Sequence, residues 1–304
     1  AVARSAKAGL PLVLRKLHLA PQWALLCAAL ITTSSAAQGQ RFTLAIARTD
    51  GLLVPFAAYD AGKWEKAWPE VDEAIDAKLP GDVPSVWRRR GERVPDLWRV
   101  SSLFGGAVID ARMSGVEPGY AHCQAQIALK TNLPRTHFDP HVSDVKFGVA
   151  VDSASVRIGM IAAVSPYDSL WSAAVRAVRT AFSNLESAVA AKDRRPLPLE
   201  TPAPAVHIEA LYREAGTTRS RLYFVAKKNY RPNVDCGVVS VMTGWLVPSG
   251  AAAYTLVDPK ITVGDCDMKN ASLGHPWASI HVSSRVFWIM QEHGYEDEQY
   301  VIAD

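Results

Sequence analysis

The sequence predicts a mainly β (α+β) protein, in which antiparallel meander sheets form a barrel or sandwich and one long amphipathic helix spans about residues 166–191. Short apolar or alternating segments recur along most of the chain with turn residues between them, which is typical of antiparallel sheets. Residues 165–192 instead carry apolar side chains at steps of three and four, the helical period. With 304 residues, 49% hydrophobic and 21% charged, the chain can build a substantial core.

The predicted helix has recognisable start and stop signals. Ser165 is expected to cap its N-terminus, with Pro166 at the first helical position. The apolar stripe consists of Leu170, Trp171, Ala174, Val175, Val178, Phe182, Leu185 and Val189. Glu186 lies away from this stripe, among the polar residues. The Pro-rich run 195–198 ends the helix, because proline cannot continue its hydrogen-bond ladder.

Residues 41–69 have the pattern of a meander. Phe42, Leu44 and Ile46 alternate with smaller residues, which is the period of a strand. The turn signal at residues 49–51, Thr-Asp-Gly, predicts a hairpin with the next strand, 52–59. A third strand is expected at residues 63–68.

The middle of the chain is predicted to contain a loop-rich stretch at residues 84–99 and then two strands. The strands are expected at residues 107–113 and 120–130. Gly115, Pro118 and Gly119 are expected to turn the chain between them, because glycine and proline are typical turn residues.

Residues 193–205 carry four prolines, which predicts a stiff, extended linker and a domain boundary. The N-terminal region would cover residues 38–192 and end in the helix, and a C-terminal antiparallel β region would cover residues 206–304. Within the C-terminal region, hairpins are expected at 207–212 with 221–226 and at 237–247 with 252–257, and a further strand at 279–290.

Residues 1–37 have the layout of a secretory signal peptide. Arg15 and Lys16 precede an apolar core at residues 23–31, and the small residues 34–37 fit a cleavage site before Gln38. The alternative is an anchor helix that stays attached, but the apolar core is shorter than the roughly 20 residues that span a bilayer. We therefore expect a secreted or periplasmic protein, with no membrane span once the leader is removed.

The remaining cysteines fit an exported protein. Cys236 and Cys266 lie in the same strand-rich region, each beside an aspartate in a turn-like context, and we predict a disulfide between them. Cys123 would then be an unpaired, buried thiol.

One cluster could hold a metal ion. His137, Asp139 and His141 alternate along an extended segment, so all three side chains could point to one side. Two imidazoles and a carboxylate suit Zn, Mn or Fe and leave positions open for water or substrate. The competing interpretation is a polar surface turn, because Pro140 would scatter the three side chains. The sequence leaves the cofactor unknown.

Four tryptophans, Trp64, Trp68, Trp87 and Trp98, are candidate ligand-binding residues, since an aromatic groove could bind a glycan. The competing interpretation places their rings in the core or at strand edges, because aromatic residues dominate protein cores.

Charge argues against nucleic acid as a partner. Four of the 33 Lys and Arg lie in the leader, which leaves 29 against 30 Asp and Glu. Binding to phosphates needs clustered positive charge, which this balance does not indicate. The sequence also contains no Gly-x-Ser-x-Gly, His-Glu-x-x-His, phosphate-binding Gly-Lys-Ser/Thr or Gly-x-Gly-x-x-Gly motif.

Patchy segments resemble exported bacterial proteins of unknown function. The likeness lies in the segments 243–246, 265–267 and 293–298, and in Asp50-Gly51 followed by residues 54–56 and Trp64. This resemblance implies no activity.

These observations favour a non-catalytic protein of the cell envelope that binds a ligand or partner, such as a glycan or an envelope protein, through strands and loops. The alternative is a secreted metal-dependent hydrolase that uses His137, Asp139 and His141.

Overall fold

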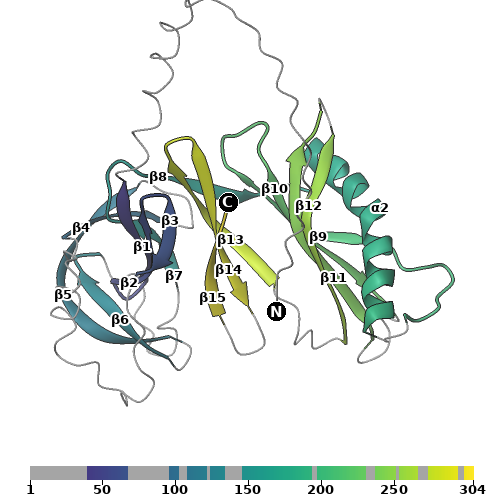
Figure 1. The fold of residues 1–304 in the computed structure, drawn as a ribbon, viewed down its shortest axis with the longest axis horizontal. Helices are drawn as coiled ribbons and strands as arrows, with labels where there is room; N and C mark the ends of the chain where they lie inside the picture. Colours follow the sequence, from purple (N-terminus) through teal and green to yellow (C-terminus); the bar gives the residue numbers. More distant parts are fainter. Residues whose placement is uncertain are drawn as a thin grey trace, which may run out of the picture.

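The computed structural model describes residues 40–67, 96–102, 108–121, 124–133, 146–193, 197–230, 237–250, 253–265, 273–293 and 298–304. These residues form two antiparallel sheets and one helix, α2 (Ser169–Lys192) (Figure 1). The prediction of a mainly β fold with one long helix is confirmed.

The first sheet closes into a barrel. In spatial order its strands are β1 (Arg41–Arg48), β7 (Lys146–Val151), β4 (Leu97–Ser102), β5 (Ile109–Ala121), β6 (Gln124–Thr131), β2 (Leu52–Asp60) and β3 (Lys63–Lys66). Because β1 also pairs with β2, six strands form the closed barrel and β3 extends it beside β2. The β1–β2 hairpin turns at the predicted residues, where Gly51 has a φ of 82° and the Asp50 carboxylate accepts a hydrogen bond from the Leu52 N–H.

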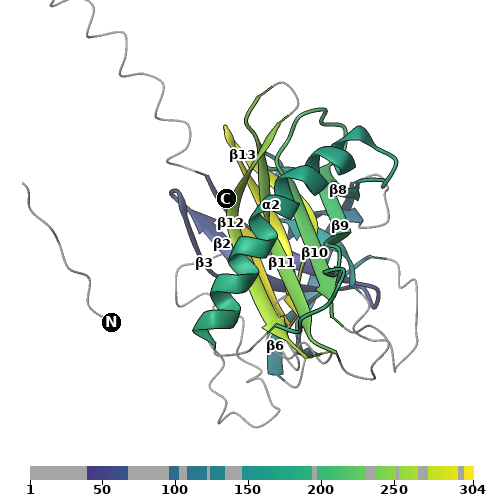
Figure 2. The same ribbon diagram turned by 90° about the vertical axis from the view of Figure 1, so that its right-hand side faces the viewer.

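The second sheet is a half-barrel. Its order is β12 (Tyr254–Gly264), β11 (Val239–Pro248), β10 (Leu222–Asn229), β9 (His207–Glu214), β8 (Arg157–Ala163), β13 (Leu273–Val282), β14 (Arg285–His293) and β15 (Glu298–Ala303). Both predicted hairpins, β9–β10 and β11–β12, are confirmed. Helix α2 lies across strands β9 to β12 (Figure 2), and Phe182, Phe224 and Met242 are fully buried between helix and sheet.

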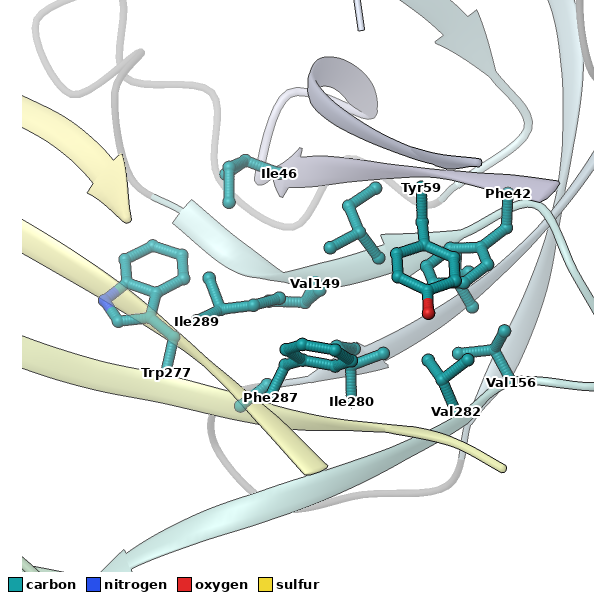
Figure 3. Packing of buried hydrophobic residues seen from close by; sticks show 13 residues of the cluster. Phe42, Ile46, Tyr59, Val149, Val156, Trp277, Ile280, Val282, Phe287 and Ile289 are labelled. Carbon is teal, nitrogen blue, oxygen red and sulfur yellow. The ribbon is translucent and has the colours of Figure 1, made fainter. Parts of the chain in front are cut away.

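The barrel packs against the other end of the half-barrel, over β13 and β14. Phe42, Tyr59 and Val149 of the barrel face Ile280, Phe287 and Ile289 of the half-barrel (Figure 3). Strand β1 is therefore buried on both sides: Leu44 and Ile46 contribute to this shared core, whereas Ala45 and Ala47 belong to the barrel's own cluster, with Trp98.

Both α2 and the barrel lie on the same face of the half-barrel, which we call the outer face. On β8, Ile158 packs toward the barrel and Ile161 points the other way, into a cluster with Tyr223 and Trp288. The face that carries this cluster is the inner face. Among the described residues, no helix combines the length and apolar character needed to cross a membrane.

The helix differs from its predicted form in two ways. Its N-cap is Asp168, whose carboxylate accepts a hydrogen bond from the Leu170 N–H, and not Ser165. Ser165 instead accepts from the Tyr167 N–H in the turn before the helix. Glu186, expected on the polar side, is 1% exposed, because its carboxylate pairs with Lys228 of β10.

The predicted boundary at residues 193–205 falls between elements that pack together. Strand β8 and helix α2 precede it, but β8 pairs with β9 and β13, and α2 packs on β12 and β11. Residues on both sides of the Pro-rich run therefore build the same half-barrel.

Three local predictions are wrong. Gly115, Pro118 and Gly119 lie inside β5 and not in a turn. Proline is tolerated there because β4 pairs with β5 only at residues 109–112, so Pro118 does not interrupt that ladder. Trp98, expected in a loop, lies in β4, and the single strand expected at 279–290 is the β13–β14 hairpin, which turns at Ser283 with a φ of 54°.

Candidate functional site

Four polar side chains meet on the inner face of the half-barrel, at strand β8, which lies between β9 and β13. Arg157 comes from β8, Glu214 from the end of β9, and Ser279 and His281 from β13. The strand register brings them together, because His281 lies opposite Arg157, and Ser279 opposite Gly159. We call these four residues the polar cluster.

Glycine at position 159 makes the polar cluster possible. Glu214 lies opposite Ile161, and its carboxylate reaches across β8 to Ser279 and His281. A Cβ atom at position 159 would collide with the Ser279 Oγ and the Glu214 Oε1. Any larger residue would therefore push the carboxylate off β8, which explains glycine in the middle of this strand.

Two charged side chains contact the His281 ring. Its Nε2 lies 2.5 Å from the Glu214 Oε1, and its Nδ1 lies 2.7 Å from the Arg157 Nη2. The Glu214 carboxylate accepts from the Nε2–H, and the Arg157 Nη2, which also lies 3.0 Å from the Nε2, lies beside both ring nitrogens. The imidazole thus links an exposed cation to a buried anion.

This arrangement does not provide an activated serine. The Ser279 Oγ lies 3.3 Å from the Nε2 of His281, the same nitrogen that contacts Glu214. In a serine–histidine–acid relay the hydroxyl and the acid occupy opposite ring nitrogens, so that the imidazole can take the hydroxyl proton. Ser279 is also fully buried. The polar cluster is therefore unsuited to nucleophilic catalysis by Ser279.

Aromatic side chains adjoin the polar cluster on the same face. Trp288 lies opposite Ser279 on the neighbouring strand, and Trp245 of β11 packs edge-on against it with 5.1 Å between ring centroids. Arg221 lies 4.8 Å above the Trp245 ring and donates to the carbonyl oxygens of Val286 and Ala303. Burial lowers the pKa of Arg221, although the negative charges of Asp304 and Glu214 act to raise it.

Tyr223 completes this packed part of the inner face. Burial raises its pKa to about 12, although its hydroxyl is hydrogen-bonded to Thr243 and to the backbone of Gly274. A Cβ at position 274 would collide with that hydroxyl, so glycine is again required by a close approach. Beside it, the Tyr212 hydroxyl lies 3.1 Å from the His275 Nδ1.

Toward β12 the inner face is open to solvent. Val257 lies opposite Trp245 in the β11–β12 pairing, and Val247 follows Trp245 on the same side of β11. Val247 is 38% exposed and Val257 44%, and the Trp245 ring is half-buried. We call these three residues the open edge.

The structure describes two of the four tryptophans predicted to bind a ligand, and it separates them. Trp98 is fully buried in the barrel, so its indole has no face free for a ligand. Trp64 packs against Phe42 and Phe287 in the core shared with the half-barrel. These placements do not support a common platform. Trp68 and Trp87 lie outside the described residues.

The remaining predicted sites also lie outside the described residues. They are the metal ligands His137, Asp139 and His141, the disulfide cysteines Cys236 and Cys266, and the leader 1–37. Within the part of the chain that the structure describes, no group of three or more His, Cys, Asp or Glu residues could hold a metal ion. The hydrolase alternative therefore stays a prediction that metal analysis would test.

Sequence reasoning did not find the polar cluster or the open edge. The spacing of Ser279 and His281, two residues apart in an expected strand, was the one available signal that they share a face. Glu214 belonged to a predicted turn, and nothing near it in sequence indicates that it meets His281. No family model, curated protein or solved structure matches the chain.

Proposed function

We propose that this is a non-catalytic binding protein, and that it holds an apolar or aromatic group of its ligand against the open edge of the half-barrel. The observation that carries the proposal is the exposure of Val247 and Val257 beside a half-buried tryptophan. Elsewhere the inner face is packed, with Trp288 and Tyr223 nearly inaccessible. Exposed apolar side chains that lie beside one another can mark a binding site.

The polar cluster supports binding over catalysis. Its serine is buried and its histidine contacts serine and carboxylate through one nitrogen, so no group is poised to attack a substrate. Export of the protein and the disulfide between Cys236 and Cys266 are part of this proposal and rest on sequence pattern alone.

A neutral fluorescent probe, N-phenyl-1-naphthylamine, tests the open edge. We expect it to bind the wild-type protein with a rise in fluorescence, and Val257→Asp to weaken that binding about tenfold or more. The reason is that burying one valine stabilises a complex by about 1.5 kcal/mol, and tenfold corresponds to about 1.4 kcal/mol.

Val108→Asp is the matched control, because Val108 is 40% exposed but precedes β5 in the barrel. It should bind the probe like the wild type. Equal weakening by both substitutions, or none by Val257→Asp, would contradict the proposal.

A further inference from the structure

Arg157 is an exposed cation held in a fixed position. Its side chain is 67% exposed, and its Nη2 lies 2.7 Å from the His281 Nδ1 and 3.8 Å from the Glu214 Oε1. Its Nη1 and Nε have no partner among the described residues. A guanidinium that is anchored on one side and open on the other is pre-organised to bind a carboxylate or a similar anion.

The other charged side chains near Arg157 are paired or buried. The cations are Arg157, Arg221 and Arg285, and the anions are Glu214 and Asp304. Asp304 pairs with Arg285, and Glu214 is buried and accepts from His281. Arg157 is therefore the exposed charge of the polar cluster, so an anion would be attracted to this position, whereas a cation would be repelled.

The exposed cation and the open edge lie on the same face of the half-barrel, with the buried side chains of Ser279 and Trp288 between them. His281 contacts Arg157, Ser279 lies opposite Trp288, Trp288 packs on Trp245, and Trp245 lies opposite Val257. A single ligand could therefore contact a charged group at one end and apolar side chains at the other. Arg221, stacked on Trp245, lies between the two ends.

We propose that the ligand is an amphiphile with a monoanionic carboxylate head, which pairs with Arg157, and an apolar chain that lies along Trp245 and Val257. This inference rests on the proposed function, because it identifies the class of ligand for the same face. It assigns Arg157 as the residue that selects the charge of the head group.

Three probes with the same chain and different heads test the inference: decanoate, decanol and decyltrimethylammonium. Isothermal titration calorimetry near neutral pH, below the concentrations at which the probes form micelles, gives each dissociation constant. We expect decanoate to bind about tenfold more tightly than decanol, a difference of about 1.4 kcal/mol, and decyltrimethylammonium to bind most weakly. Arg157→Gln should remove the preference for decanoate and leave decanol binding unchanged.

Arg176→Gln is the control, because Arg176 is exposed on α2 and lies on the outer face. It should keep the preference. Arg157→Lys keeps the positive charge but loses the paired N–H donors of the guanidinium, so it should keep part of the preference for decanoate. This substitution serves as a second variant if Arg157→Gln is poorly folded.

The outcomes separate this inference from the proposed function. Equal binding of decanoate and decanol, or a preference that survives in Arg157→Gln, would overturn the role of Arg157 and leave an apolar binding face. If none of the three probes binds, both proposals fail.

Discussion

Single residues decide whether the inner face can form. Gly159 is the clearest case, because the absence of a side chain lets the Glu214 carboxylate cross β8 to reach His281. The absence of a side chain at Gly274 likewise makes room for the Tyr223 hydroxyl. Burial of polar groups so close to an aromatic cluster is tolerated because each one finds a hydrogen-bond partner.

Tyr223 gives a prediction at alkaline pH. Its pKa is about 12 in the native protein, against 10.0 for an ordinary tyrosine. Above pH 10 the unfolded chain therefore loses the phenolic proton before the native state does, so stability should fall by roughly 2–3 kcal/mol between pH 10 and 12. Urea unfolding over this range would measure the slope.

Tyr223→Phe is the control for that slope. It should be less stable near neutral pH by about 1–2 kcal/mol, because Thr243 loses a buried hydrogen-bond partner. Its stability should fall less steeply above pH 10, because the contribution of Tyr223 is gone. It should still fall to some extent, because the raised pKa values of Tyr212, Tyr230 and Tyr254 remain. Parallel curves for the two proteins would show that Tyr223 does not cause the loss.

At the scale of an element, helix α2 is held on the half-barrel by an apolar stripe and by one buried ion pair. The Lys228 Nζ lies 2.7 Å from the Glu186 Oε2 and 4.8 Å from the centre of the Tyr230 ring. Burial lowers the pKa of Lys228, but the hydrogen bonds to Glu186 and Tyr230 outweigh it, and the pKa is raised overall. The ammonium therefore stays charged inside the interface.

Glu186→Ala should destabilise the protein by about 3–5 kcal/mol, because it leaves a charged lysine buried without its carboxylate. The double variant Glu186→Leu/Lys228→Met should recover most of this loss, since it removes both charges and retains volume. Chemical denaturation of the two variants would measure the difference.

Arg179→Ala, on the exposed side of the same helix, is the matched control and should change stability by less than about 0.5 kcal/mol. The account of the ion pair fails if Glu186→Ala costs no more than this control.

At the scale of the whole molecule, one core joins barrel and half-barrel. The ring centroid of Phe287 in β14 lies 5.9 Å from that of Tyr59 and 5.3 Å from that of Trp64, both of which belong to the first sheet. The Phe287 side chain is 1% exposed. A second core lies between α2 and the outer face of the half-barrel. The half-barrel is thus supported from its outer face at both ends, and neither α2 nor the barrel covers its inner face.

Phe287→Ala should lower the free energy of unfolding by about 3–5 kcal/mol, because it opens a cavity in the core that the two sheets share. Leu273→Ala, at a 39% exposed position on the neighbouring strand β13, is the control and should cost less than about 0.5 kcal/mol. Denaturant unfolding followed by tryptophan fluorescence would compare them, and similar costs would mean that the shared core does not stabilise the molecule.

The sequence by itself determined the class of the fold, the helix and the hairpins β1–β2, β9–β10 and β11–β12, because these depend on local signals. The helical period of residues 165–192 and the turn at residues 49–51 act over a few residues, and both were confirmed.

Only the tertiary structure decided the closure of the barrel, the burial of Glu186 and Trp98, and the assembly of the polar cluster. The pairing of strands far apart in sequence has no local signature, since any apolar strand can pair with several others. The pairing is selected by how much apolar surface the whole chain buries. Arg157, Glu214 and His281 became neighbours because the strands on which they lie were placed by that global requirement.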